Sequence, residues 1–201
     1  MKNTLICTVY YDDSIKLAIK DYKINKVIFL KDKNPDKKDQ QEAIDKLIEY
    51  NKGIVDFEEK EIPKYDIIEI VKKSVEIIRK QPKEDNIYLD ITQGKRTQSI
   101  GLLFAGYKNH SRIKRILYAK EIEKNKYELI TLPKLHFKDS DAKILKAIEE
   151  EMTPKQIIDK KIVSRGTFYN KVEELESHGF IEKLTDGKYV VTESGRIMAL
   201  K

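Results

Sequence analysis

The chain has 201 residues, 40% hydrophobic and 37% charged, and a formal net charge of +6. It is long enough to bury one large core or two small ones, and its excess of cations favours anionic partners without identifying one. A single cysteine, Cys7, excludes a disulfide framework and a cysteine-rich metal site and indicates a reducing compartment.

Other classes of protein are also disfavoured. The apolar start at residues 4–11 is too short for a signal peptide, and no stretch has the length needed to cross a bilayer. The three histidines lie in separate segments without ligand spacing. We therefore expect a cytoplasmic protein with no metal site, no cofactor and no membrane partner.

Six short segments rich in β-branched and aromatic residues predict strands. They span residues 4–10, 26–31, 54–62, 86–91, 115–120 and 127–132. Between the first four, residues 13–23, 40–51 and 65–80 place apolar side chains at three-to-four spacing, which predicts helices. This alternation predicts an α/β, Rossmann-like, mostly parallel six-stranded sheet, with an antiparallel hairpin of the last two strands at one edge.

In such a sheet, ligands bind at the carboxyl ends of the strands where the strand order reverses. If the first strand lies between the second and the fourth, the loops at residues 10–14 and 90–98 border this crevice. Gly94 permits a tight turn, and the helix that follows from near Arg96 offers free N–H groups to an anion. The sequence predicts a site for a phosphorylated ligand; alternatively, the polar loop only ends the strand and caps the helix.

The segment "DITQGKRTQS" resembles the signature that follows the fourth strand of CARF domains, the CRISPR-associated Rossmann folds. The resemblance implies a sensor of cyclic oligoadenylate, tetra-adenylate being favoured, that binds at a homodimer interface. Asp12 and Asp13 would repel phosphate unless they point away or bind ribose or adenine. The predicted ligand contacts are Tyr10, Tyr11, Ser14, Thr92, Gln93, Gly94, Lys95, Arg96, Thr97 and Gln98.

After residue 138 the pattern becomes helical. Thr153 and Gln156 form a capping box around Pro154, and Ser164 caps a helix with Phe168, Val172 and Leu175 on its apolar face. The pair Asp186-Gly187 then predicts a hairpin. Residues 166–183 and 190–200 resemble the recognition helix, wing and closing elements of bacterial and archaeal transcriptional regulators, so we expect a winged helix-turn-helix domain.

The recognition helix suggests double-stranded DNA as a partner. Asn can bind adenine edges bidentately, and hydroxyls and cations suit phosphate. Residues 139–201 hold 11 Lys and Arg against 12 Asp and Glu, which argues for weak non-specific affinity and for a dimer. The predicted DNA contacts are Lys161, Ser164, Arg165, Thr167, Tyr169, Asn170, Lys171 and Lys188.

The sequence therefore predicts three parts: a CARF ligand-sensing domain at 1–132, a linker at 133–138 and a winged helix-turn-helix domain at 139–201. We expect a homodimeric transcriptional regulator and no enzyme, since no positioned histidine or carboxylate pair accompanies the cations. Two alternatives stay open: a ring nuclease that uses its winged domain for dimerisation or protein contacts, and a regulator of the same architecture that senses an ordinary nucleotide.

Overall fold

The computed structural model describes residues 1–32, 39–123, 126–131 and 139–200. The chain divides into two compact units, Met1–Leu135 and His136–Lys201. The predicted linker at 133–138 lies outside the described residues. Within the described ranges, no helix has the length and apolar character needed to cross a membrane.

The first unit alternates strands and helices along the chain. Its strands are β1 (Asn3–Thr8), β2 (Lys26–Asp32), β3 (Asp56–Ile62), β4 (Asn86–Asp90), β5 (Ile113–Glu123) and β6 (Lys126–Thr131). Its helices are α1 (Asp13–Tyr22), α2 (Asp39–Tyr50), α3 (Ile67–Lys80) and α4 (Arg96–Lys108). Each of these elements overlaps its predicted counterpart, because the apolar periodicity that produced the prediction is the pattern buried in the core.

The strands form one sheet in the order β3-β2-β1-β4-β5-β6. The first five are parallel, which confirms the Rossmann-like prediction, and β6 pairs antiparallel with β5. Strand β1 lies between β2 and β4, so the strand order reverses there. The loops after β1 and β4 therefore lie side by side at the carboxyl edge of the sheet.

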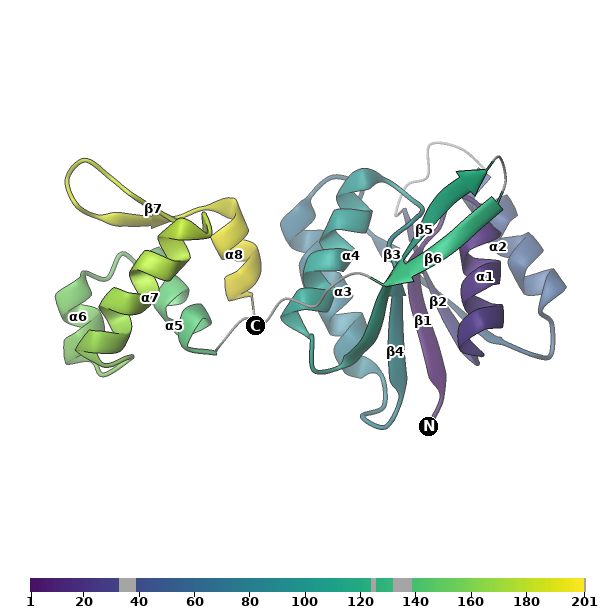
Figure 1. The fold of residues 1–201 in the computed structure, drawn as a ribbon, viewed down its shortest axis with the longest axis horizontal. Coiled ribbons are helices and arrows are strands. Elements are labelled where there is room, and N and C mark those ends of the chain that lie inside the picture. The colour runs from purple at the N-terminus through teal and green to yellow at the C-terminus, as the bar shows by residue number, and fades with distance from the viewer. Residues whose placement is uncertain (33–38, 124–125, 132–138, 201) are drawn as a thin grey trace. The chain divides into compact units, whose positions relative to one another are not determined.

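Helices cover both faces of the sheet: α1 and α2 lie on one, α3 and α4 on the other (Figure 1). On the α1 and α2 side, Ile15, Ile44 and Leu47 are buried against residues of β1 and β2. On the other side α3 and α4 pack closely, since a Cβ at Gly101 would lie 2.5 Å from Ile70 Cγ2. Gly101 therefore sets the distance between the two helices.

The start of the third strand differs from its prediction. The strand expected at 54–62 begins at Asp56, because residues 54 and 55 belong to the turn after α2. The amides of Ile54 and Val55 both donate to the Asn51 carbonyl, at 3.0 and 3.2 Å. Two consecutive β-branched residues at a helix end look like the start of a strand, and only the local hydrogen bonds distinguish the two.

The second unit contains α5 (Asp139–Glu149), α6 (Pro154–Asp159), α7 (Arg165–Ser177), β7 (Ile181–Lys183), β8 (Tyr189–Val191) and α8 (Glu193–Ala199). The caps form as predicted: Thr153 and Gln156 make the capping box of α6, and the Ser164 hydroxyl accepts from the Thr167 amide. Phe168, Val172 and Leu175 are the buried face of α7. Strands β7 and β8 form an antiparallel hairpin around the Asp186-Gly187 turn.

Candidate functional site

The loop between β4 and α4 turns sharply at Gly94, whose φ is +89°. A Cβ at this position would lie 2.7 Å from Thr8 Cβ, on β1. The Thr8 hydroxyl donates to the Gln93 carbonyl, and Ser99 Oγ donates to the same carbonyl at 2.8 Å. The loop is thus fastened to β1 at the point where the strand order reverses, with the first turn of α4 beside it.

Replacing Gly94 by Ala is expected to destabilise the first unit. The positive φ costs about 1–2 kcal/mol for a residue with a Cβ, and overpacking against Thr8 adds about 1–3 kcal/mol. Gly53→Ala is the matched control, because Gly53 has a φ of +79° but nothing within 4 Å of a built Cβ. Urea denaturation should show the larger loss for Gly94→Ala; equal losses would mean that Thr8 yields freely.

Thr92 and Asp90 stabilise the loop from within. The Asp90 carboxylate is fully buried and accepts from both the amide and the hydroxyl of Thr92. The Thr92 hydroxyl in turn accepts from the Ala119 amide at 2.7 Å. This hydroxyl thus donates to Asp90 and accepts from Ala119 within the fold, and the ligand contact predicted for Thr92 stays a prediction.

Burial raises the pKa of the Asp90 carboxyl, although the Thr92 hydrogen bonds and the nearby Ser14 hydroxyl lower it in part. The carboxyl consequently binds its proton more tightly in the folded than in the unfolded chain. Its contribution to stability falls as pH rises from the unfolded pKa of about 3.9 through the raised folded pKa.

The variant Asp90→Asn is expected to remove this pH dependence. Its amide oxygen can still accept from Thr92, and no charge is left to desolvate, so the free energy of unfolding at pH 7 should be equal to or above that of the wild type. Urea denaturation of both proteins at several pH values between 4 and 7 measures the difference. A variant that is less stable than the wild type at every pH in this range would contradict the inference that burial destabilises the charged form of Asp90.

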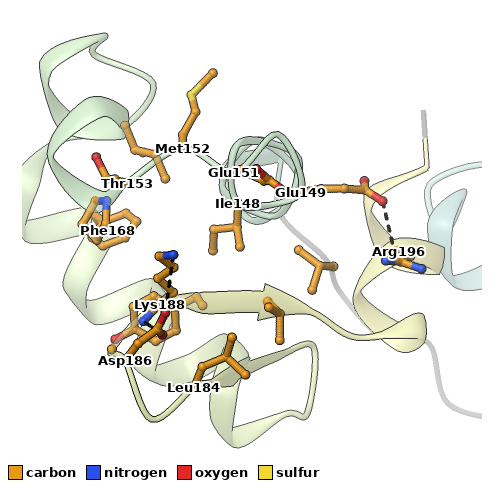
Figure 2. Close-up of a pocket in the computed structure, with 16 residues that line it drawn as sticks. Ile148, Glu149, Glu151, Met152, Thr153, Phe168, Leu184, Asp186, Lys188 and Arg196 are labelled. Atoms are coloured by element: carbon orange, nitrogen blue, oxygen red, sulfur yellow. Dashed lines mark hydrogen bonds and ion pairs between the residues drawn. The ribbon is translucent and has the colours of Figure 1, made fainter.

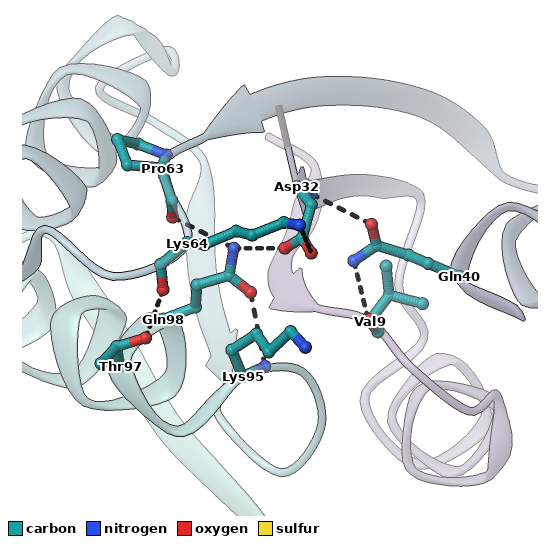
Figure 3. A network of polar contacts seen from close by, with 8 residues as sticks. All are labelled: Val9, Asp32, Gln40, Pro63, Lys64, Lys95, Thr97 and Gln98. Carbon is teal, nitrogen blue, oxygen red and sulfur yellow. Dashed lines mark hydrogen bonds and ion pairs between the residues drawn. The ribbon is translucent and has the colours of Figure 1, made fainter. Parts of the chain in front are cut away.

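A polar network joins the carboxyl ends of three strands (Figure 3). The Gln98 side chain is buried and its Nε2 donates to Asp32 Oδ1 at 2.7 Å and to the Pro63 carbonyl at 3.2 Å. The Gln40 side chain links the same Asp32 to β1: its Oε1 accepts from the Asp32 backbone amide, and its Nε2 donates to the Val9 carbonyl. Gln98 is therefore an internal bridge, which corrects its prediction as a ligand contact.

The loop between β3 and α3, residues 63–66, lies against the start of α4. The Thr97 hydroxyl donates to the Lys64 carbonyl, so Thr97 joins the loop to α4, and its predicted ligand contact stays a prediction. Lys64 Nζ lies 4.0 Å from Asp32 Oδ2. The predicted site omitted this loop, although one signal was present: it follows a parallel strand of the same sheet, and such loops share one edge.

The loop after β1 has two exposed or partly exposed aromatic residues. The rings of Tyr10 and Tyr11 meet edge to face, with centroids 5.1 Å apart. Asp12 forms an ion pair with Lys16 at 2.5 Å, which neutralises one of the two acids that would repel a phosphate. Ser14 is buried at the start of α1, and the structure thus corrects its prediction as a ligand contact.

Most of the predicted ligand residues are exposed or half-buried at this edge. Arg96 and Tyr11 are exposed, and Tyr10, Gln93 and Lys95 are half-buried. Two cations, the N–H groups at the start of α4 and aromatic rings therefore gather where the strand order reverses. This combination suits an anion that also carries planar rings.

In the second unit, the face of α7 opposite its buried residues presents Asn170 to solvent, flanked by Thr167 and Tyr169. Arg165 and Lys161 are also exposed. Lys188 lies on the β7–β8 turn, where it pairs with Asp186 at 3.4 Å and stays largely exposed. These predicted DNA contacts are exposed, and so is Ser164, although its hydroxyl also caps α7.

Lys171 is the exception on α7. Its side chain is only 12% exposed and pairs with Asp141 at 3.2 Å and with Glu174 at 2.5 Å. The hydrogen bond to Glu174 is the main reason for the raised pKa of Lys171. The structure thus corrects the prediction of a DNA contact, since Lys171 joins α7 to α5.

A pocket of about 530 Å³ lies between the β7–β8 hairpin and helices α5, α6 and α7 (Figure 2). Ile148, Met152 and Phe168 contribute apolar lining, and Arg196 pairs with Glu149 at its rim, at 3.4 Å. Phe168 points to the opposite side of α7 from Asn170. The pocket and the predicted DNA-contact face are therefore on different sides of this helix.

A family model described as "HFX_2341_N:-like, N-terminal" matches residues 5–125. No curated protein matches the chain. The match covers strands β1 to β5, including both loops at the carboxyl edge.

Three solved structures are similar at low sequence identity. Csm6 of Enterococcus italicus, bound to cyclic hexa-2'-fluoro-hexa-dAMP, has a TM-score of 0.52 at 12% identity; the match covers 89% of this chain and 55% of that one. Can2 of Sulfobacillus thermosulfidooxidans, in complex with cyclic tetra-adenylate, has a TM-score of 0.49 at 13% identity, and the match covers 98% of this chain and 62% of that one. VC1899 of Vibrio cholerae has a TM-score of 0.49 at 12% identity, and the match covers 98% of this chain and 64% of that one. This chain thus spans less than two thirds of these proteins, and the Csm6 match shows a shared fold.

Proposed function

The chain belongs to the family described as "HFX_2341_N:-like, N-terminal", and from that premise we propose that its first unit is a CARF-type sensor that binds a cyclic oligoadenylate. The observation that carries the proposal is the reversal of strand order between β1 and β4, with Lys95, Arg96 and the start of α4 beside it. These groups are proposed to bind the phosphates of the ligand. The fold shared with a Csm6 that binds a cyclic hexanucleotide analogue supports it.

The ligand is proposed to be shared by two copies of the chain. Apolar residues lie all round α4: Leu102 and Ala105 face the core, while Ile100 is 44% exposed and Leu103 and Phe104 are half-buried. A helix that is apolar on all sides is usually buried on all sides, so the outer face of α4 favours a second copy as its cover. Light scattering of the purified protein tests for this homodimer.

The second unit is proposed to be a winged helix-turn-helix that binds double-stranded DNA, with α7 as recognition helix and the β7–β8 hairpin as wing. The exposed Asn170 and Arg165 and the capped start of α7 support this role. Two copies related by a two-fold axis require a pseudo-palindromic site, with half-sites about one helical turn or a multiple of it apart. Together the two units form a CRISPR-associated transcriptional regulator.

Isothermal titration calorimetry with cyclic tetra-adenylate and with cyclic hexa-adenylate tests the sensor role. We expect saturable heat with at least one ring and one ring bound per dimer. Absence of heat with both rings would reject the proposal and leave the loop at 90–98 as a helix cap. Mass spectrometry of the ligand after incubation distinguishes an intact ring, which a sensor leaves, from the linear products of a ring nuclease.

A further inference from the structure

The β3–α3 loop, residues 63–66, is held rigidly beside the proposed nucleotide site. Two of its carbonyls, those of Pro63 and Lys64, accept hydrogen bonds from the side chains of Gln98 and Thr97 in the first turn of α4. Asp66 then caps α3 by accepting from the Glu69 amide at 3.0 Å. The loop is thus fixed at both ends, so its backbone keeps a constant position relative to α4.

Tyr65 is 69% exposed on this rigid loop. As the residue before the N-cap of α3, it could form a hydrophobic staple with Ile70, one turn into the helix. Ile70, however, is fully buried against Gly101, and Tyr65 is left largely in water. The fold therefore gives this large ring no packing role.

Lys64 adds a cation to the same loop. Its side chain is only 14% exposed, and the partner carboxylate of Asp32, 4.0 Å away, also accepts from Gln98. The carboxylate is therefore shared between a cation and an amide donor. Lys64 thus belongs to the polar network around Asp32 and Gln98.

We propose that the β3–α3 loop is a third wall of the nucleotide site, in which the Tyr65 ring stacks on a nucleobase of the ligand; this rests on the proposed function of the first unit. The cations at 95 and 96 take the phosphates, and a base projecting from the ring toward β3 meets Tyr65. A tyrosine ring has only two side-chain torsions to order, and the backbone of its loop is already held, so stacking on a base adds little further ordering cost.

Three substitutions at position 65 separate stacking from hydrogen bonding. Tyr65→Leu is expected to weaken binding of cyclic tetra-adenylate or cyclic hexa-adenylate roughly tenfold, within the range that stacking of one base accounts for. Tyr65→Phe keeps the ring and should bind as the wild type does. Tyr50→Leu is the matched control, because Tyr50 is 77% exposed at the far end of α2.

Fluorescence gives an independent readout, since the chain contains no tryptophan. Tyr65→Trp introduces the sole indole, whose emission should change when a base stacks on it, whereas Tyr50→Trp should show no change on adding the same ligand. If the wild type binds neither ring, the proposed function fails and the stacking role fails with it. If the wild type binds, but Tyr65→Leu binds equally well and Tyr65→Trp emission stays constant, only the stacking role is overturned.

Discussion

Reversing the charge of Lys95 and Arg96 together is expected to abolish cyclic oligoadenylate binding. Each cation that meets a phosphate contributes about 1.5–3 kcal/mol through a charge-assisted hydrogen bond. The double variant Lys95→Glu and Arg96→Glu loses both contacts and adds repulsion, so the affinity should fall at least about 10²–10⁴-fold. Calorimetry at a fixed salt concentration should then show no saturable heat.

The matched control carries the same change in net charge at the opposite edge of the sheet. Lys80 and Lys83 are exposed at the end of α3 and in the loop before β4. The variant Lys80→Glu and Lys83→Glu should keep wild-type affinity for the ligand, apart from a small long-range effect that salt screens. If both double variants lose binding equally, the effect comes from overall charge and the site is not at 95 and 96.

Thermal unfolding of both double variants tests whether a loss of binding comes from a loss of structure. Arg96 is exposed and Lys95 is half-buried, and the contacts that hold the loop are those of Thr8, Thr92 and Gln98. Surface substitutions away from such contacts usually change stability by less than about 0.5 kcal/mol. Both double variants should therefore unfold near the wild-type temperature and, in the absence of ligand, bind DNA as well as the wild type does.

The fold could be predicted because local patterns and global packing agree in this chain. The apolar positions of α1 and α3 repeat at helical spacing and are the positions buried against the sheet. The same holds for α7, whose Phe168, Val172 and Leu175 are its buried residues. Turn and cap signals such as Gly94 and Thr153 are also local, since they depend on backbone angles and on partners within one turn.

The roles of individual polar residues could not be predicted, because their partners lie far away in the sequence. Gln98 bonds to Asp32, 66 positions earlier, and Thr92 accepts from Ala119, 27 positions later. Nothing in a local pattern distinguishes an amide that bridges loops from one that awaits a ligand. Lys171 is a similar case, since its position on α7 left open whether it faced DNA or Asp141 of α5.

The second large effect is expected on DNA recognition. Asn170 is exposed on the face of α7 opposite Phe168, and alanine is a good helix former, so Asn170→Ala should leave the fold intact. Loss of a bidentate base contact removes about 1–3 kcal/mol of discrimination against the wrong base. Affinity for a preferred duplex should fall accordingly, while affinity for unrelated duplexes stays the same.

Arg165→Ala is expected to give the contrasting result, because the exposed cation at the first position of α7 is proposed to contact phosphate, and a phosphate contact carries no sequence information. It should weaken binding to every duplex alike and reduce the slope of log affinity against log salt by about one. Selection of binding sites from random duplexes, followed by titration of the preferred site and a scrambled one at several salt concentrations, measures both effects. An Asn170→Ala variant that keeps its base preference, or an Arg165→Ala variant with an unchanged salt slope, would mean that α7 does not enter the major groove and that the second unit binds another kind of partner.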